Sequence, residues 1–178
     1  MSVFDTSSAT NMNYMFRDCS ALTSLGVSGF DTSKVTDMRM MFDNCSALTS
    51  LDVSGFNTSN VAHMRYMFYY CLKLTSLDLS NFNTSKVTDM NYMFRDCSAL
   101  TSLDLSSFNM AKVTNSGNML DFGTSNKIQT LKTPYNNSTA IAITTGSTLY
   151  KEDTGAVVTS VPANTTKSLT YVNQNPFS

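Results

Sequence analysis

The sequence predicts an α/β repeat fold in which each unit contributes a short strand and a short helical segment. Three observations support this prediction. One phenylalanine recurs every 26 residues, and methionine-phenylalanine pairs and single cysteines keep the same period. One part of the unit carries apolar residues two apart, and another part carries them three and four apart. The recurring residues are Phe4, Phe30, Phe56, Phe82 and Phe108; Met15-Phe16, Met41-Phe42, Met67-Phe68 and Met93-Phe94; and Cys19, Cys45, Cys71 and Cys97.

The repeat itself is the strongest signal in the chain. The 26-residue units that begin at Phe30 and Phe82 are identical at 19 positions. A fifth unit begins at Phe108 and has Gly123 where the other units have cysteine. Its Ile128 and Leu131 come two residues later than the repeat requires. The sequence therefore predicts about five units over residues 1–133, the last of them degenerate.

Each unit divides into a strand part and a helical part. In the second unit Leu48, Leu51 and Val53 have the LxxLxL spacing, and the last two point to one side of a strand. Apolar residues from Val35 to Cys45 lie three and four apart, which predicts one face of a helical segment. Thr36 is the expected N-cap of that segment, with Asp37 in its first turn.

A single unit cannot cover its own apolar face, so we expect the units to stack in register. The expected architecture is a leucine-rich-repeat solenoid, with a short parallel sheet on one side and helical segments on the other. Residues 134–178 form a separate β-rich cap with strands at 140–144, 148–150, 156–161 and 168–172. The segment 151–155, which ends in Gly155, is the expected hairpin turn of this cap.

Composition excludes several classes of protein. The net charge is −1 and only 14% of the residues are charged, so nothing favours binding to nucleic acid or to an acidic membrane. The sequence contains no apolar stretch long enough for direct membrane insertion. The N-terminus lacks the pattern of a secretory signal, but the chain opens within a repeat, so we expect the natural protein to extend upstream of Met1.

The layout MFxxCxxLxxLxLSxFxTSxVTxM resembles the BspA-like bacterial surface leucine-rich repeats of the 26-residue type, over residues 1 to about 133. This resemblance implies an extracellular or cell-surface protein of bacteria or of some parasitic protists. It also implies adhesion to host proteins or other cells, without a catalytic site or a cofactor.

The cysteines and the single histidine are the first candidates for chemistry. All four cysteines hold one position of successive units, so we expect a column of inert buried thiols rather than disulfides or a metal site. His63 shares its repeat position with Asn11, Asp37, Asp89 and Asn115, which predicts a solvated helix start. One histidine beside buried thiols gives little support to hydrolase chemistry, and we expect no catalytic residue and no metal ligand.

The outward side of the predicted strands is the candidate binding face. Three aspartates form one column, flanked by rows of serine, and as neighbouring carboxylates they should raise one another's pKa. The simpler interpretation is a solubilising stripe; the alternative is a bound cation or a basic partner. The residues of this face are Asp52, Asp78, Asp104, Ser50, Ser76, Ser102, Ser54, Ser80 and Ser106.

Tyrosines form a second candidate surface. One repeat position carries Tyr14, Met40, Tyr66 and Tyr92, and the third unit adds Tyr69 and Tyr70. These rings are either interface anchors or a cover for the helical side of the core, and the sequence does not decide between the two.

The leading hypothesis for function is a bacterial cell-surface adhesion module. It would recognise a protein or another macromolecule of a host or neighbouring cell through the exposed strand face. The alternative is a structural spacer of a larger surface protein with no ligand of its own, which the uniformity of the outward positions favours. An enzyme is not expected, and the sequence leaves the oligomeric state open.

Overall fold

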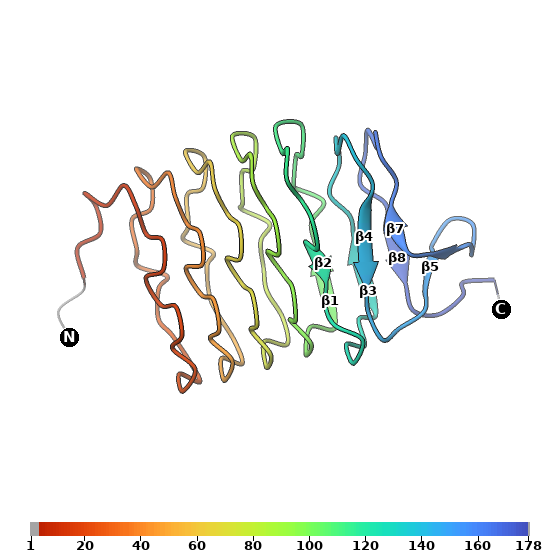
Figure 1. The fold of residues 1–178 in the computed structure, drawn as a ribbon, viewed down its shortest axis with the longest axis horizontal. Helices are drawn as coiled ribbons and strands as arrows, with labels where there is room; N and C mark the ends of the chain where they lie inside the picture. Colours follow the sequence, from red (N-terminus) through yellow and green to blue (C-terminus); the bar gives the residue numbers. More distant parts are fainter. Residues whose placement is uncertain (1–3, 178) are drawn as a thin grey trace.

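The computed structural model describes residues 4–177 as a row of stacked coils (Figure 1). Each 26-residue unit makes one coil, and equivalent residues of successive units lie side by side along the row. Isolated parallel bridges join such residues, for example Asp37 to His63 and His63 to Asp89. The stacking predicted from the period is therefore present.

The regular secondary structure of residues 4–177 consists of short strands near the C-terminal end of the row. A five-stranded sheet has the order β1-β3-β8-β5-β6, and a three-stranded sheet has the order β2-β4-β7. The strands are β1 (Ser102–Asp104), β2 (Leu120–Asp121), β3 (Thr130–Lys132), β4 (Ile141–Thr144), β5 (Leu149–Lys151), β6 (Val157–Val158), β7 (Ser160–Val161) and β8 (Thr170–Val172).

The predicted fold class, an α/β leucine-rich-repeat solenoid with helical segments, is wrong, because the described residues contain no helix. The segment expected to be helical forms consecutive tight turns. The N–H of Met41 donates to the carbonyl of Met38 (3.3 Å), and that of Cys45 donates to Phe42 (3.2 Å). Bonds between residues three apart bring side chains three apart to the same side. The apolar spacing of such turns therefore imitates that of a helix.

Backbone conformation explains why these turns do not continue as a helix. The third residue of each turn has a positive φ, as in type II turns: 55° at Met40 and 56° at Asn44. Every second peptide unit then points along the row. The N–H of Met38 donates to His63 of the next coil (3.0 Å), and the N–H of Phe42 donates to Met67 (3.0 Å). The backbone polar groups of this side are thus satisfied between coils rather than within one.

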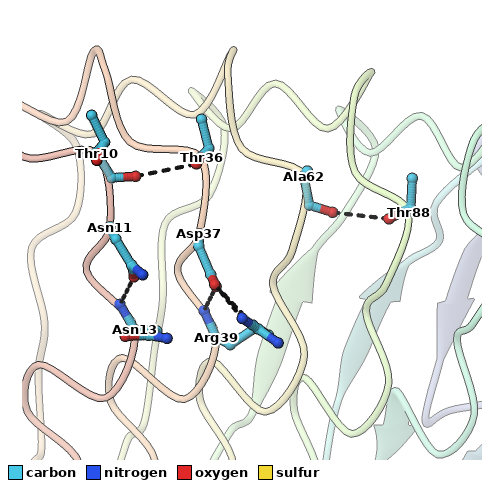
Figure 2. A network of polar contacts seen from close by, with 8 residues as sticks. All are labelled: Thr10, Asn11, Asn13, Thr36, Asp37, Arg39, Ala62 and Thr88. Carbon is cyan, nitrogen blue, oxygen red and sulfur yellow. Dashed lines mark hydrogen bonds and ion pairs between the residues drawn. The ribbon is translucent and has the colours of Figure 1, made fainter.

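Thr36 is not a helix N-cap. Its hydroxyl and its N–H both donate to the carbonyl of Thr10 in the preceding coil, at 3.2 and 2.8 Å. Asp37 accepts the N–H of Arg39 (3.0 Å) and also pairs with the Arg39 guanidinium, whereas in the first coil Asn11 accepts only the N–H of Asn13 (2.9 Å). Figure 2 shows this row of polar contacts running from coil to coil.

The predicted parallel sheet is present only at the end of the array. β1 pairs with β3 in parallel, with Leu103 opposite Leu131. The equivalent segment around Leu51 is not a strand. Its neighbour Thr49 makes one backbone bond to Thr23, at 3.3 Å. The prediction of strands in the earlier units is therefore wrong, although their apolar residues do face the interior.

The core is a set of columns of identical side chains. The rings of Phe42 and Phe68 stack with centroids 5.7 Å apart and 7° between their planes, and Phe68 and Phe94 repeat this geometry at 5.8 Å. Such offset aromatic pairs add about 0.5–1.5 kcal/mol each beyond the area they bury. The methionine, leucine and valine columns of the interior coils are buried beside them. Burial in this array comes from the neighbouring coils.

Buried threonines bind one coil to the next. The hydroxyl of Thr58 accepts the N–H of Asn83 (2.8 Å) and donates to the carbonyl of the same residue (3.1 Å). Thr32 makes the same two bonds to Asn57. Each hydroxyl thereby satisfies both backbone groups of one residue in the following coil.

The tail extends both sheets of the last coils. β4 pairs in parallel with β2, and β8 pairs antiparallel with β3. The predicted hairpin is confirmed, since β5 pairs antiparallel with β6 and the N–H of Gly155 donates to Lys151 (2.8 Å). The division into residues 1–133 and 134–178 stays a prediction.

Candidate functional site

The nine residues of the predicted binding face are all exposed. We call them the Asp-Ser face; only Ser102 and Asp104 of this set lie in a strand, β1. Each aspartate turns back on the serine two residues later. The carboxylate of Asp52 accepts the N–H of Ser54 at 3.0 Å and its hydroxyl at 2.6 Å. The face is thus a row of similar Asp-Ser turns, one per coil.

The pKa values of these aspartates lie below the ordinary value, although Asp104 and Asp52 act to raise that of Asp78, as expected. Hydrogen bonds from Ser54 lower the pKa of Asp52, and those from Ser80 lower the pKa of Asp78. Burial opposes the change at Asp104, but hydrogen bonds from Lys132 and Ser106 bring its pKa below the ordinary value. Hydrogen bonds from these neighbouring donors outweigh the repulsion between aspartates of adjacent coils, because solvent screens the exposed carboxylates from one another.

One of the three carboxylates already has a cationic partner. The Nζ of Lys132 lies 2.7 Å from Oδ2 of Asp104, and both side chains are about half exposed. Among the described residues, no lysine or arginine forms an ion pair with Asp52 or Asp78, whose carboxylates accept hydrogen bonds from the serines two residues later. A basic partner would therefore meet its strongest attraction at Asp52 and Asp78.

The tyrosines lie on the surface, on the side of each coil that carries the tight turns. Tyr14 is 46% exposed and Tyr70 is 40% exposed. Tyr66 and Tyr92 are half-buried and stack with centroids 4.8 Å apart. The guanidinium of Arg95 lies 5.2 Å above the ring of Tyr92, and Arg65 and Arg17 stack in the same way on Tyr66 and Tyr14. These rings lie over tight turns rather than over a helix, and their part in binding stays a prediction.

A shallow hollow opens beside Tyr69 and Tyr70 of the third coil. It is lined by Arg17, Asp18, Asp43, Asn44, Tyr69 and Tyr70. Its polar side chains hold one another across coils. The Nε of Arg17 lies 3.0 Å from Oδ2 of Asp43, and the amide of Asn44 donates to Asp18 at 2.9 Å. We call this set the tyrosine hollow.

The comparisons with known proteins give a family. A family model described as a Mycoplasma protein of unknown function, DUF285, matches residues 1–77 and 50–143. The chain belongs to the DUF285 family. No curated protein and no solved structure matches it.

The cysteines of this DUF285 chain are free, as expected, and three of them are buried. The thiol of Cys71 donates to the carbonyl of Phe42 (3.3 Å), and that of Cys97 donates to Phe68 (3.0 Å). Burial raises the pKa of Cys45 and of Cys97 to about 12. These thiols are therefore unreactive at neutral pH and serve as small core residues.

His63 does not begin a helix in the DUF285 repeat. It is half-buried, and its backbone bridges the second and fourth coils through Asp37 and Asp89. Within residues 4–177, no three histidine, cysteine, aspartate or glutamate side chains gather as they would around a metal ion. The described part of the chain also has no helix suited to crossing a membrane.

Sequence reasoning did not single out four residues of the tyrosine hollow: Arg17, Asp18, Asp43 and Asn44. A signal for two of them exists in the repeat. One position reads Arg17, Asp43, Tyr69, Arg95 and Asp121 from coil to coil, so basic and acidic residues alternate around a tyrosine. In a stack, such alternation indicates ion pairs between neighbouring coils, as found for Arg17 with Asp43 and for Arg95 with Asp121 (3.5 Å).

Proposed function

We propose that this DUF285 chain is a binding module of a bacterial cell-surface protein. It would recognise a protein or another macromolecule of a host or neighbouring cell. Two lines support the proposal: the repeat motif resembles BspA-like surface repeats, and the family model matches most of the chain. An extracellular or cell-surface location is part of the proposal, as is the absence of enzymatic activity.

The observation that carries the proposal is the exposure of the whole Asp-Ser face over three successive coils. A specific protein interface needs about 800 Å² on each partner, which is an area for several coils rather than a pocket. The three carboxylates have lowered pKa values, so all are ionised at neutral pH. The expected partner therefore presents basic groups, and its affinity should fall as salt is added.

The test compares two sets of Asp-Ser turns. The purified chain is tested for binding to extracellular-matrix and cell-surface proteins, and a bound protein is then tested against the triple variant Asp52→Ala, Asp78→Ala, Asp104→Ala. Asp5→Ala with Asp31→Ala is the matched control, because these exposed aspartates make the same turn with Ser7 and Ser33. A loss of at least tenfold in the triple variant alone supports the face. Equal affinities for all three proteins would overturn it.

A structural spacer is the second candidate. The uniformity of the Asp-Ser face favours it, since a dedicated recognition surface would differ from coil to coil. A spacer predicts that no ligand is captured from the protein panel, and that replacing the array by another of equal length leaves the function of the parent protein intact.

A further inference from the structure

The third coil departs from its neighbours at two adjacent positions. Tyr70 stands where the first, second and fourth coils have Asp18, Asn44 and Asp96, and its φ is 59°. Asparagine and aspartate adopt this left-handed conformation far more readily than a bulky aromatic residue does. Tyr70 is also 40% exposed, so its ring adds little to the core. Neither local conformation nor packing explains a tyrosine here.

The side chains around Tyr70 form the tyrosine hollow and are held in place by contacts with one another. Tyr69 packs with its ring centroid 5.5 Å from that of Tyr70, and it meets Tyr66 edge to face at 5.3 Å. Across the hollow, Asp43 is buried and holds Arg17, while Asn44 holds Asp18. The polar groups are thereby fixed before any ligand arrives, and preorganisation of this kind favours binding.

We propose that the tyrosine hollow binds a neutral sugar ring of a glycan, with the pyranose lying against Tyr70 and its hydroxyls bonded by the polar wall. The C–H groups on one face of a pyranose carry partial positive charge, which suits the negative face of an aromatic ring. The polar side chains of the hollow offer both hydrogen-bond donors and acceptors: Arg17 donates, Asp18 and Asp43 accept, and Asn44 does both. This site lies outside the Asp-Ser face and goes beyond the function proposed for that face.

The mixture of donors and acceptors favours a sugar over a peptide. A proline-rich segment also packs on tyrosine rings, but its backbone offers carbonyl acceptors and no N–H at proline, so carboxylates would have no partner. A sugar hydroxyl donates to a carboxylate and accepts from a guanidinium at the same time. The two carboxylates and the one guanidinium of the hollow also disfavour an anionic sugar.

The test uses a substitution that the repeat itself supplies. Tyr70→Asn inserts the residue that the second coil has at the same place with the same backbone conformation, so the variant should fold at least as well. Phe177→Ala is the control, since it removes an exposed aromatic ring that lies outside the lining of the hollow. The circular dichroism and thermal midpoint of both variants are measured first.

The probes are methyl glycosides of neutral hexoses and neutral oligosaccharides. Their binding is measured by saturation-transfer NMR and by tyrosine fluorescence, which no tryptophan obscures in this chain. We expect binding by the wild-type chain, a loss of at least tenfold in Tyr70→Asn, and a change of less than twofold in Phe177→Ala. Equal binding by Tyr70→Asn would overturn the site. Failure of every neutral glycan would overturn the proposal, whether or not a proline-rich peptide binds instead. Neither result bears on the Asp-Ser face, which its own triple variant tests.

Discussion

The first and third coils have nearly the same apolar residues and yet differ sharply in burial. Met67 and Leu74 of the third coil are 0% exposed, whereas their counterparts Met15 and Leu22 are 43% and 37% exposed. The third coil is covered on both sides and the first on one side within the described residues. A unit of this fold therefore acquires its core from its neighbours, so that the same substitution should have different effects at different places in the row.

The largest expected difference is in the phenylalanine column. Phe68→Ala should lower the free energy of unfolding by about 3–5 kcal/mol, because the ring is fully buried between two stacked rings. Phe16→Ala, in the first coil, should cost less than half as much, since Phe16 stacks on Phe42 alone within this column. Urea unfolding followed by circular dichroism measures both. Equal losses would mean that burial by neighbours does not set stability.

Thiol reactivity sharpens the same comparison. Burial raises the pKa of Cys45 and Cys97 to about 12 and also raises that of Cys71, whereas Cys19 of the first coil is only half-buried. In the folded chain at pH 8, iodoacetamide should modify Cys19 at least about 100-fold faster than the other three. Mass spectrometry of peptides from timed samples gives the rates. In 8 M urea as a control, all four thiols should react alike; protection of Cys19 in the folded chain would contradict the comparison.

The threonine column offers a smaller contrast. Thr58→Val removes a hydroxyl that satisfies both backbone groups of Asn83, and it should cost about 1–3 kcal/mol. Thr6→Val is its counterpart in the first coil. The hydroxyl of Thr6 is buried and has no hydrogen-bond partner among the described residues, so its loss should change stability by less than about 0.5 kcal/mol. Thermal and urea unfolding of the two variants decide the point, and a large loss in Thr6→Val would refute it.

The smallest expected effect is a difference in how the stability contributions of two aspartates of the second coil, Asp37 and Asp43, depend on pH. Burial acts to raise the pKa of Asp37, but hydrogen bonds and the charge of Arg39 lower it below its ordinary value of 3.8. Its stabilising contribution is therefore full above that value and lost as the pH falls through the lower folded pKa. Asp37→Asn should cost about 1 kcal/mol at pH 7 and progressively less as the pH falls below the ordinary pKa of 3.8.

Asp43 should behave in the opposite sense. Burial raises the pKa of Asp43, so its protonation favours the folded chain as the pH falls from neutrality. The wild-type chain should therefore gain stability relative to Asp43→Asn as the pH falls through the raised folded pKa toward the ordinary value of 3.8. Urea unfolding at several pH values compares the two variants, and parallel pH profiles would contradict the assignment.

The period of 26 residues was enough to predict the stack and most of its core, because identical columns can be buried together only if the units lie in register. It was not enough to predict the turns. Met38, Met41 and Phe42 satisfy the spacing of a helix face, and bonds between residues three apart produce the same spacing. Positive φ at Met40 and at four tyrosines has no sequence signal, since these residues rarely adopt it. In this stack, contacts between coils override local preference.

The candidate site, like the fold, could be predicted only in part. Exposure of the Asp-Ser face followed from the alternation of Leu51, Asp52 and Val53, but the pKa direction did not, because it depends on Ser54 turning back on the carboxylate. The tyrosine hollow could not be predicted from the sequence. Its members come from three coils, and only the stack brings Asp18, Asn44 and Tyr70 to one surface.

The alignment of peptide units along the turn side gives the row a direction. On that side the N–H of Met12, Met38, Met64 and Met90 each points to the coil that follows, at 2.8–3.0 Å from its carbonyl. At these positions the two ends of the row differ, one carrying carbonyl acceptors and the other N–H donors, whereas the N–H of Thr36 donates in the opposite direction, to Thr10. Two rows could not meet acceptor end to acceptor end without repulsion, whereas lengthening by whole units preserves every bond. Duplication in multiples of 26 residues is thus the change in length that this backbone tolerates best.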